Sequence, residues 1–293
     1  MSERNLRTAV RGHGCNHRWR LEIQLRFASC MAPNAEPFFV ETAHFIGDRM
    51  GIEAIIAHDD QWASRERLID EGQIEVGWLC GLPYVWKADL PSPPVELLAA
   101  PVMRAARYKR RPVYFSDVLV RSDSHWRNFS ELRGARWAYN EPASHSGYNV
   151  VKSYLYDLDQ KAGFFGSVHM AGSHEQALEL LLDGSIDAAA IDTTVFEIAV
   201  REKPDYARHL RSIETLGPSP MPSWVVSTSV DKGTRARIRQ ALTEMHQHPQ
   251  GARILQRHNA ARYAAVDDAF YDPIRTMDWK ARRVLFGDET ADP

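Results

Sequence analysis

The segment from Tyr139 to Leu155 gathers small polar side chains just before a helix-like pattern. Its sequence, YNEPASHSGYNVVKSYL, places Ser144, His145, Ser146 and Gly147 where a loop becomes a helix. Backbone N–H groups in the first turn of a helix have no intrahelical partner, and the helix dipole adds partial positive charge there. Hydroxyl and imidazole groups add donors, and glycine lets a guest approach the backbone. The segment predicts a site for a small anion.

Two other interpretations concern the serines of this segment. Ser144 or Ser146 can simply be the N-cap of the helix, since serine is among the favoured capping residues. A serine nucleophile is disfavoured, because the G-x-S-x-G elbow requires a glycine two residues after the serine and neither serine has one.

A second segment, GSHEQALELLLDGSIDAAAIDTTVFE from Gly172 to Glu197, has the same character. The pattern S-x-x-Q before an apolar stripe predicts a helix with a capping box, and His174 stands at its start. The apolar run that follows predicts a buried strand, which ends at Asp192 and Thr193. His174 is a candidate anion donor, although a surface histidine near a cap explains it equally well.

The elements that must position these residues alternate between strand and helix. Apolar alternation and breaker residues predict strands over 21–30, 51–57, 74–79 and 136–139, and helices over 36–50 and 64–71. This order favours parallel sheets with helices on both faces. Ligands of such sheets bind beyond the carboxyl ends of the strands, where both polar segments lie.

The second half of the chain repeats the first. Arg26-Phe-Ala before a proline-containing loop returns as Arg136-Trp-Ala, 110 residues later. The helix end and strand start around Gly72 return around Gly184, 112 residues later. Nearly equal offsets predict two related α/β lobes with a cleft between them.

Length and composition agree with a two-lobed water-soluble protein. The 293 residues exceed the usual size of one hydrophobic core, and 44% hydrophobic with 25% charged residues is ordinary for a globular chain. A net charge of -2 disfavours a nucleic-acid partner, although the basic run 104–111 is an alternative patch. No apolar run approaches the roughly 20 residues of a membrane span.

We expect no cofactor and no metal. The chain has no G-x-x-x-x-G-K-[ST] or G-x-G-x-x-G motif, and its three cysteines, Cys15, Cys30 and Cys80, are too widely spaced for a zinc knuckle. His246, His248 and His258 lack the zinc-protease spacing. Residues 1–20 are basic without an apolar core, which predicts a disordered leader rather than a secretory signal.

These motifs together resemble the periplasmic substrate-binding proteins of phosphate, phosphite and phosphonate ABC transporters. The resemblance covers about residues 21 to 283. It rests on the order of four segments: Ile74–Trp78, Pro142–Tyr148, Gly172–Leu178 with the following strand, and Asp267–Arg275.

The resemblance implies a two-lobed α/β fold of the second periplasmic-binding-protein type, with two mixed, mostly parallel sheets flanked by helices and joined by two hinge strands. We expect the hinge strands over 114–120 and 222–227. The first lobe would combine 21–113 with 227–293, and the second would span 114–226.

The resemblance also implies roles for single residues. Ser144, His145, Ser146 and Gly147 match the family's oxyanion loop, with histidine in place of the middle threonine. His174 matches a phosphonate-contacting histidine. Tyr114 matches a cleft-facing aromatic residue, and we expect Tyr84, Asp192 and Thr193 to line the rest of the site. Thr194 stands where an aminoalkylphosphonate binder of the family carries a glutamate.

The function implied is a non-catalytic solute-binding component of an ABC transport system, which binds a phosphonate or related phosphorus oxyanion and delivers it to a permease. Its place would be the periplasm by resemblance, or the cytoplasm if translation starts at Met1, since no secretory signal is visible. Two alternatives are an enzyme on the same scaffold, similar to thiamine-pyrimidine synthases, and a cytoplasmic small-molecule sensor.

Overall fold

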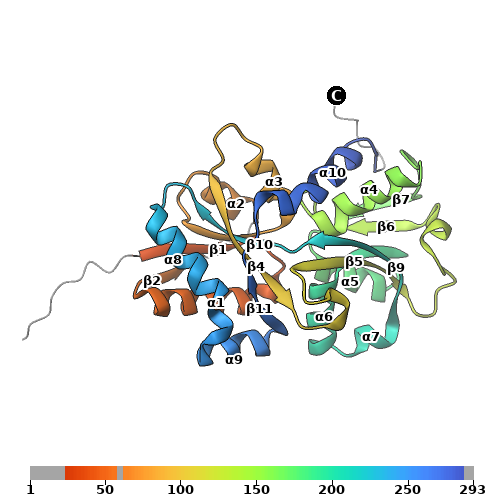
Figure 1. The fold of residues 1–293 in the computed structure, drawn as a ribbon. Helices are drawn as coiled ribbons and strands as arrows, with labels where there is room; N and C mark the ends of the chain where they lie inside the picture. The colour runs from red at the N-terminus through yellow and green to blue at the C-terminus, as the bar shows by residue number, and fades with distance from the viewer. Residues whose placement is uncertain (1–23, 58–61, 287–293) are drawn as a thin grey trace, which may run out of the picture.

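The computed structural model describes residues 24–57 and 62–286, and these form two α/β lobes that lie side by side (Figure 1). The first lobe is built on a six-stranded sheet in the order β11-β4-β10-β3-β1-β2, and the second on a five-stranded sheet in the order β7-β6-β8-β5-β9. The strands are β1 (Gln24–Ser29), β2 (Glu53–Ile56), β3 (Val76–Leu79), β4 (Val95–Met103), β5 (Val113–Arg121), β6 (Arg136–Tyr139), β7 (Ser167–Met170), β8 (Ala188–Asp192), β9 (Leu210–Pro220), β10 (Ser223–Ser227) and β11 (Ala260–Ala264).

Helices flank both sheets. They are α1 (Glu36–Met50), α2 (Trp62–Asp70), α3 (Gly81–Ala88), α4 (Val150–Asp157), α5 (His174–Leu182), α6 (Thr193–Glu202), α7 (Asp205–His209), α8 (Lys232–Thr243), α9 (Pro249–Arg257) and α10 (Asp272–Ala281). The predicted helix over 36–50 is confirmed: it ends at Gly51, whose φ of 65° is the left-handed conformation that glycine adopts without strain. No helix among the described residues is long and apolar enough to cross a membrane. The predicted leader, residues 1–20, lies outside them.

The two lobes repeat each other, as the offsets predicted. The parallel strands β2-β1-β3 of the first lobe have the same order as β7-β6-β8 of the second. The matched arginines also make the same contact. Arg26 donates its backbone N–H to Glu75 at 2.7 Å and pairs with it through its guanidinium, and Arg136 does the same with Asp187 at 2.8 Å.

Both sheets are mixed, as expected, but they are not mostly parallel. Among the described strands, four pairings are parallel and five are antiparallel. Each of the strands β5 and β10 is the first strand after the chain crosses from one lobe to the other. Each runs antiparallel to both of its neighbours in the sheet. Alternating strand and helix patterns do not reveal such a change of direction, because they describe each strand without its partners.

The crossings between the lobes lie almost entirely outside the predicted hinge strands. The chain passes from β4 to β5 through residues 104–112, and from β9 to β10 through residues 221–222. The first predicted hinge strand, 114–120, is wrong, because it lies inside β5 of the second sheet. The second, 222–227, includes the crossing residue 222, but its other residues form β10 of the first sheet. Accordingly, the predicted lobe boundary at 226 moves to 221–222.

The C-terminal segment joins both lobes, whereas the sequence predicted that it belongs to the first. In Figure 1, α10 lies between α3 of the first lobe and α4 of the second. Lys280 of α10 pairs with Asp157 of α4 at 2.7 Å. Beyond α10, Val284 and Phe286 are buried in the hydrophobic core of the second lobe. A terminal segment of this kind is assigned by its packing, which local sequence patterns do not show.

Candidate ligand-binding site

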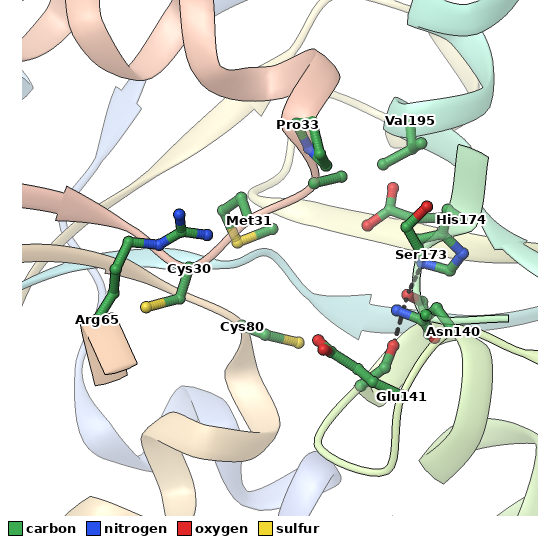
Figure 2. Close-up of a pocket in the computed structure, with 15 residues that line it drawn as sticks. Cys30, Met31, Pro33, Arg65, Cys80, Asn140, Glu141, Ser173, His174 and Val195 are labelled. Carbon is green, nitrogen blue, oxygen red and sulfur yellow. Dashed lines mark hydrogen bonds between the residues drawn. The ribbon is translucent and has the colours of Figure 1, made fainter. Parts of the chain in front are cut away.

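A cavity of about 170 Å³ lies between the two lobes. Figure 2 shows its walls, which come from the loops after β1 and β3 in the first lobe and after β6, β7 and β8 in the second. These are the carboxyl ends of the parallel strands in each lobe, as the sheet architecture predicts. The lining residues are Cys30, Met31, Ala32, Pro33, Arg65, Cys80, Asn140, Glu141, Ser144, Ser146, Gly172, Ser173, His174, Asp192 and Val195.

The loop after β6 presents Ser144 and Ser146 to this cavity. Ser144 is the cap of a short π-helical turn, His145–Asn149, which leads into α4; its hydroxyl accepts the Gly147 N–H at 3.1 Å. The capping interpretation of Ser144 is confirmed, and it coexists with the placement on the cavity wall. The hydroxyl groups of Ser144 and Ser146 lie 3.5 Å apart. Two buried serines with neighbouring hydroxyls therefore line the same part of the cavity.

His174 completes this group of donors. It begins α5, whose cap is Ser173: the Ser173 hydroxyl accepts the Gln176 N–H at 3.0 Å, as the capping-box pattern predicted. His174 Nε2 lies 2.9 Å from Ser146 Oγ, while its Nδ1 is buried and has no hydrogen-bond partner within 24–57 and 62–286. Burial lowers the pKa of His174 to about 4, so the ring is neutral at physiological pH.

Asp192 lies on the cavity wall at the end of β8. Its Oδ1 accepts hydrogen bonds from the backbone N–H and the hydroxyl of Thr194, both at 2.7 Å, and so caps α6. Burial raises the pKa of Asp192 to about 6, and these hydrogen bonds oppose that rise. Thr194 is thus held by Asp192.

Two residues of the predicted oxyanion loop do not line the cavity. His145 is fully buried, with Nε2 2.9 Å from Ser219 Oγ and Nδ1 3.1 Å from Asn149 Nδ2. Burial lowers its pKa to about 3, so it is a neutral interior residue. Gly147 is required for packing: a Cβ there would lie 2.1 Å from Asn140 Oδ1. The expected direct contacts of both residues with a ligand are not supported by this placement.

Three further predicted residues lie behind the cavity wall. The Tyr84 hydroxyl donates to Asp268 at 2.7 Å, within the first lobe. The Thr193 hydroxyl accepts from the Tyr108 hydroxyl at 3.1 Å. Tyr114 is buried with its hydroxyl next to Cys80 and Ser146, one layer from the cavity. Neighbouring residues at a strand end point their side chains in different directions. The position of a residue at a strand end therefore does not tell whether its side chain lines the cavity.

Sequence reasoning missed the first-lobe side of the cavity. Residues 30–33 and Cys80 follow β1 and β3, so the strand-end rule that selected Asp192 applies to them equally. Glu141 lies in the loop after β6, which also carries Ser144. Arg65 comes from α2, and no local pattern marks it. Burial raises the pKa of the Cys30 thiol to about 12 and that of Cys80 to about 11, so both thiols are neutral.

A family model decides what kind of protein has this site. The model of the periplasmic substrate-binding protein of phosphonate ABC transporters matches residues 34–271, which include the serine loop, His174 and Asp192. The chain belongs to this family. It is therefore a substrate-binding protein of the ABC-transporter type, as the four motifs predicted, and the members of its family are periplasmic.

Solved structures share the fold of this binding protein. The binding protein of a phosphonate ABC transporter from Pseudomonas aeruginosa has a TM-score of 0.78 and 17% identity, with 89% of this chain and 88% of that chain covered. PhnD1 of Prochlorococcus marinus in complex with methylphosphonate has a TM-score of 0.77 and 16% identity, with 89% of this chain and 99% of that chain covered. A Xanthomonas citri protein bound to ATP has a TM-score of 0.70 and 17% identity, with 89% of this chain and 97% of that chain covered. The predicted type 2 periplasmic-binding-protein fold is confirmed.

The described residues of this binding protein contain no group of three or more histidine, cysteine, aspartate and glutamate side chains that could hold a metal ion. The basic run after β4 also has intramolecular partners. Arg107 makes a bidentate pair with Asp117 at 2.7 and 2.8 Å, and Arg104 donates to the Ala260 carbonyl at 2.8 Å.

Proposed function

We propose that this binding protein holds a small phosphonate or related phosphorus oxyanion in the interlobe cavity and delivers it to an ABC permease. The observation that carries the proposal is the group of donors on one cavity wall: His174 Nε2 lies 2.9 Å from Ser146 Oγ, and Ser144 Oγ lies 3.5 Å from Ser146 Oγ. Two hydroxyls and an imidazole that meet on one wall of a cavity suit the oxygens of an oxyanion.

The donors suit an anion without needing a cation of their own. If neutral His174 donates its Nε2–H to Ser146 Oγ, the hydroxyl hydrogens of Ser146 and Ser144 are both available to an anion. Hydrogen bonds from such groups to an ionised oxygen are shorter and stronger than those between neutral groups. The small volume, about 170 Å³, favours a ligand of a few heavy atoms over a nucleotide.

Contacts between the lobes support binding by closure. Asn34, at the entry to α1, donates its backbone N–H to Glu175 at 3.2 Å and its side-chain amide to the Val195 carbonyl at 3.0 Å. Both acceptors belong to the second lobe. A ligand enclosed in a cavity that both lobes line stabilises the closed arrangement over the open one, which shifts the population of the protein toward closure.

A calorimetric panel tests this function. Methylphosphonate, phosphite, phosphate, sulfate and arginine would be titrated into the full chain at pH 7, with thermal unfolding as a parallel readout. We expect a phosphorus oxyanion to bind and to stabilise the fold by a few kcal/mol at saturating concentration. Failure of every phosphorus oxyanion to bind, with arginine or sulfate binding instead, would refute the proposal.

Delivery and location need separate tests. Co-purification with a permease complex reconstituted in vesicles, dependent on methylphosphonate, would support the transport role. Fractionation of cells that express the chain from its own start codon would report export, because the periplasmic location is so far a property of the family. Recovery of unchanged methylphosphonate after prolonged incubation is expected, and its conversion would favour the enzyme alternative.

A further inference from the structure

Glu141 brings a carboxylate into the cavity that we propose for an anion. It follows β6 directly and stands on the wall formed by the second lobe, in the same loop as Ser144. Figure 2 shows its side chain pointing toward Cys80 of the first lobe. The carboxylate therefore lies at the junction of the two lobes, inside the cavity that holds the oxyanion donors.

Among the described residues, no cation forms an ion pair with Glu141. Arg65 and Glu66 of α2 have opposite charges, and Glu66 itself pairs with Lys87 at 2.9 Å. The two thiols in the cavity are neutral, and His174 is neutral as well. The titratable and charged groups that the described residues place near this part of the cavity are Cys30, Arg65, Glu66, Cys80, His174 and Asp192.

Of the two carboxyl groups that the described residues place on the cavity wall, Glu141 is the better proton acceptor. Asp192 accepts two hydrogen bonds from Thr194, which favour its ionised form. Burial raises the pKa of Glu141 to about 7; the Glu66 charge adds to this rise, and Arg65 reduces it. Near neutral pH Glu141 is therefore close to the midpoint between its two protonation states. An anion placed beside it favours the protonated state further, because two negative charges in a small cavity repel each other.

Building on the proposed function, we infer that Glu141 couples ligand binding to a proton: the filled cavity holds a hydrogen between the Glu141 carboxyl group and an oxygen of the ligand. The hydrogen comes from Glu141 itself, from solvent or from the ligand. In each case the Glu141 carboxyl group and the ligand share one acidic hydrogen, so a hydrogen bond forms where two negative charges would otherwise repel each other. The ligand class is thus an oxyanion that accepts from a carboxylic acid or brings its own acidic hydrogen.

The sign of the pH dependence separates this inference from its main competitor. If a proton is shared, affinity falls as pH rises above about 7, because ionised Glu141 must first be protonated. If Glu141 instead pairs with an ammonium group of the ligand, affinity rises over the same range, because the ionised form is the one that binds.

The test is the number of protons taken up on binding. Methylphosphonate would be titrated at pH 8 in two buffers with different ionisation enthalpies, using the wild type, Glu141→Gln and the control Glu202→Gln. Glu202 is an exposed residue at the end of α6 and lies outside the cavity. Protonation of methylphosphonate in solution is the same for all three proteins, so the comparison isolates Glu141.

We expect the wild type and Glu202→Gln to take up close to one proton more than Glu141→Gln. From pH 7 to pH 9, the wild-type Kd should weaken by up to about tenfold per pH unit relative to Glu141→Gln. Glu141→Ala, which has no side-chain donor, should lose the same proton uptake and bind more weakly than Glu141→Gln. Glu141→Ala therefore tests the same proton uptake independently if Glu141→Gln fails to fold.

Each other outcome counts against the inference. Equal proton uptake in the wild type and both Glu141 variants, with methylphosphonate bound by all, overturns it and leaves the proposed function standing. Tighter wild-type binding at higher pH, relative to Glu141→Gln, also overturns it and assigns Glu141 to a cation. Failure of the wild type to bind any phosphorus oxyanion overturns the proposed function, and the inference with it.

Discussion

Replacing Ser146 with alanine removes one proposed donor and leaves the fold around it in place. The Ser146 hydroxyl lies 2.9 Å from His174 Nε2, and its backbone carbonyl accepts from the Ser116 hydroxyl at 2.6 Å, a bond that the substitution retains. A hydrogen bond to a charged group contributes about 1.5–3 kcal/mol. Its loss should therefore weaken methylphosphonate binding by about 10- to 150-fold.

The same substitution should also lower stability, for a reason that the structure makes explicit. His174 Nδ1 has no hydrogen-bond partner among the described residues, so alanine at 146 would leave both ring nitrogens of a buried histidine without one. Such a group destabilises the fold by about 1–3 kcal/mol. Saturating ligand should recover part of this loss, because the oxyanion accepts from the ring.

Isothermal titration calorimetry and urea unfolding measure the two effects separately. The matched control is Ser153→Ala, since Ser153 on α4 is as buried as Ser146, each 4% exposed, and does not line the cavity. We expect its affinity to equal that of the wild type. If Ser146→Ala binds methylphosphonate as tightly as Ser153→Ala, Ser146 is not a ligand donor and the placement of the oxyanion is wrong.

Three other substitutions probe the surroundings of the site. Gly147→Ala would place a Cβ 2.1 Å from Asn140 Oδ1, so we expect a loss of about 1–3 kcal/mol in urea unfolding together with weaker ligand binding; unchanged values of both would contradict the packing argument. Phe286→Ala should destabilise the second lobe by about 3–5 kcal/mol in the same assay, and a loss below 1 kcal/mol would show that the C-terminal segment does not pack there. His145→Gln should change the pH dependence of stability: burial lowers the pKa of His145 to about 3, so its contribution is complete above pH 6.5 and is lost as pH falls toward 3. Between pH 6 and 4 we expect the variant to lose about 1.4 kcal/mol per pH unit less than the wild type, and an equal slope would refute this assignment.

Much of the local structure follows from the sequence because its causes lie within a few residues. Gly51 ends the helix over 36–50, and Ser173 caps the helix that begins at His174. The strand over 136–139 has the predicted bounds, since a short apolar run between breaker residues is a local signal. The repeat was visible for the same reason: the strand and helix starts of each lobe carry similar residues at nearly constant offsets.

The assignment of strands to sheets was not visible in this way. The strands β5 and β10 are almost continuously buried, so their patterns fit either lobe and either direction. Hydrogen bonding to β8 and β9, or to β3 and β4, decides where each belongs. The hinge prediction was wrong because strand pairing depends on residues far away along the chain.

The binding site also has features that depend on nearby residues and features that depend on distant ones. Hydroxyls and a helix start can be recognised at Ser144 and Ser146 without a structure, because loop and cap chemistry is local. Packing in three dimensions places His174 on the cavity wall and buries His145 next to Ser219. The same packing brings Arg65 and Glu141 from different lobes to one cavity. Burial lowers the pKa of both histidines, so their roles differ because packing in three dimensions places one on the cavity wall and the other in the interior.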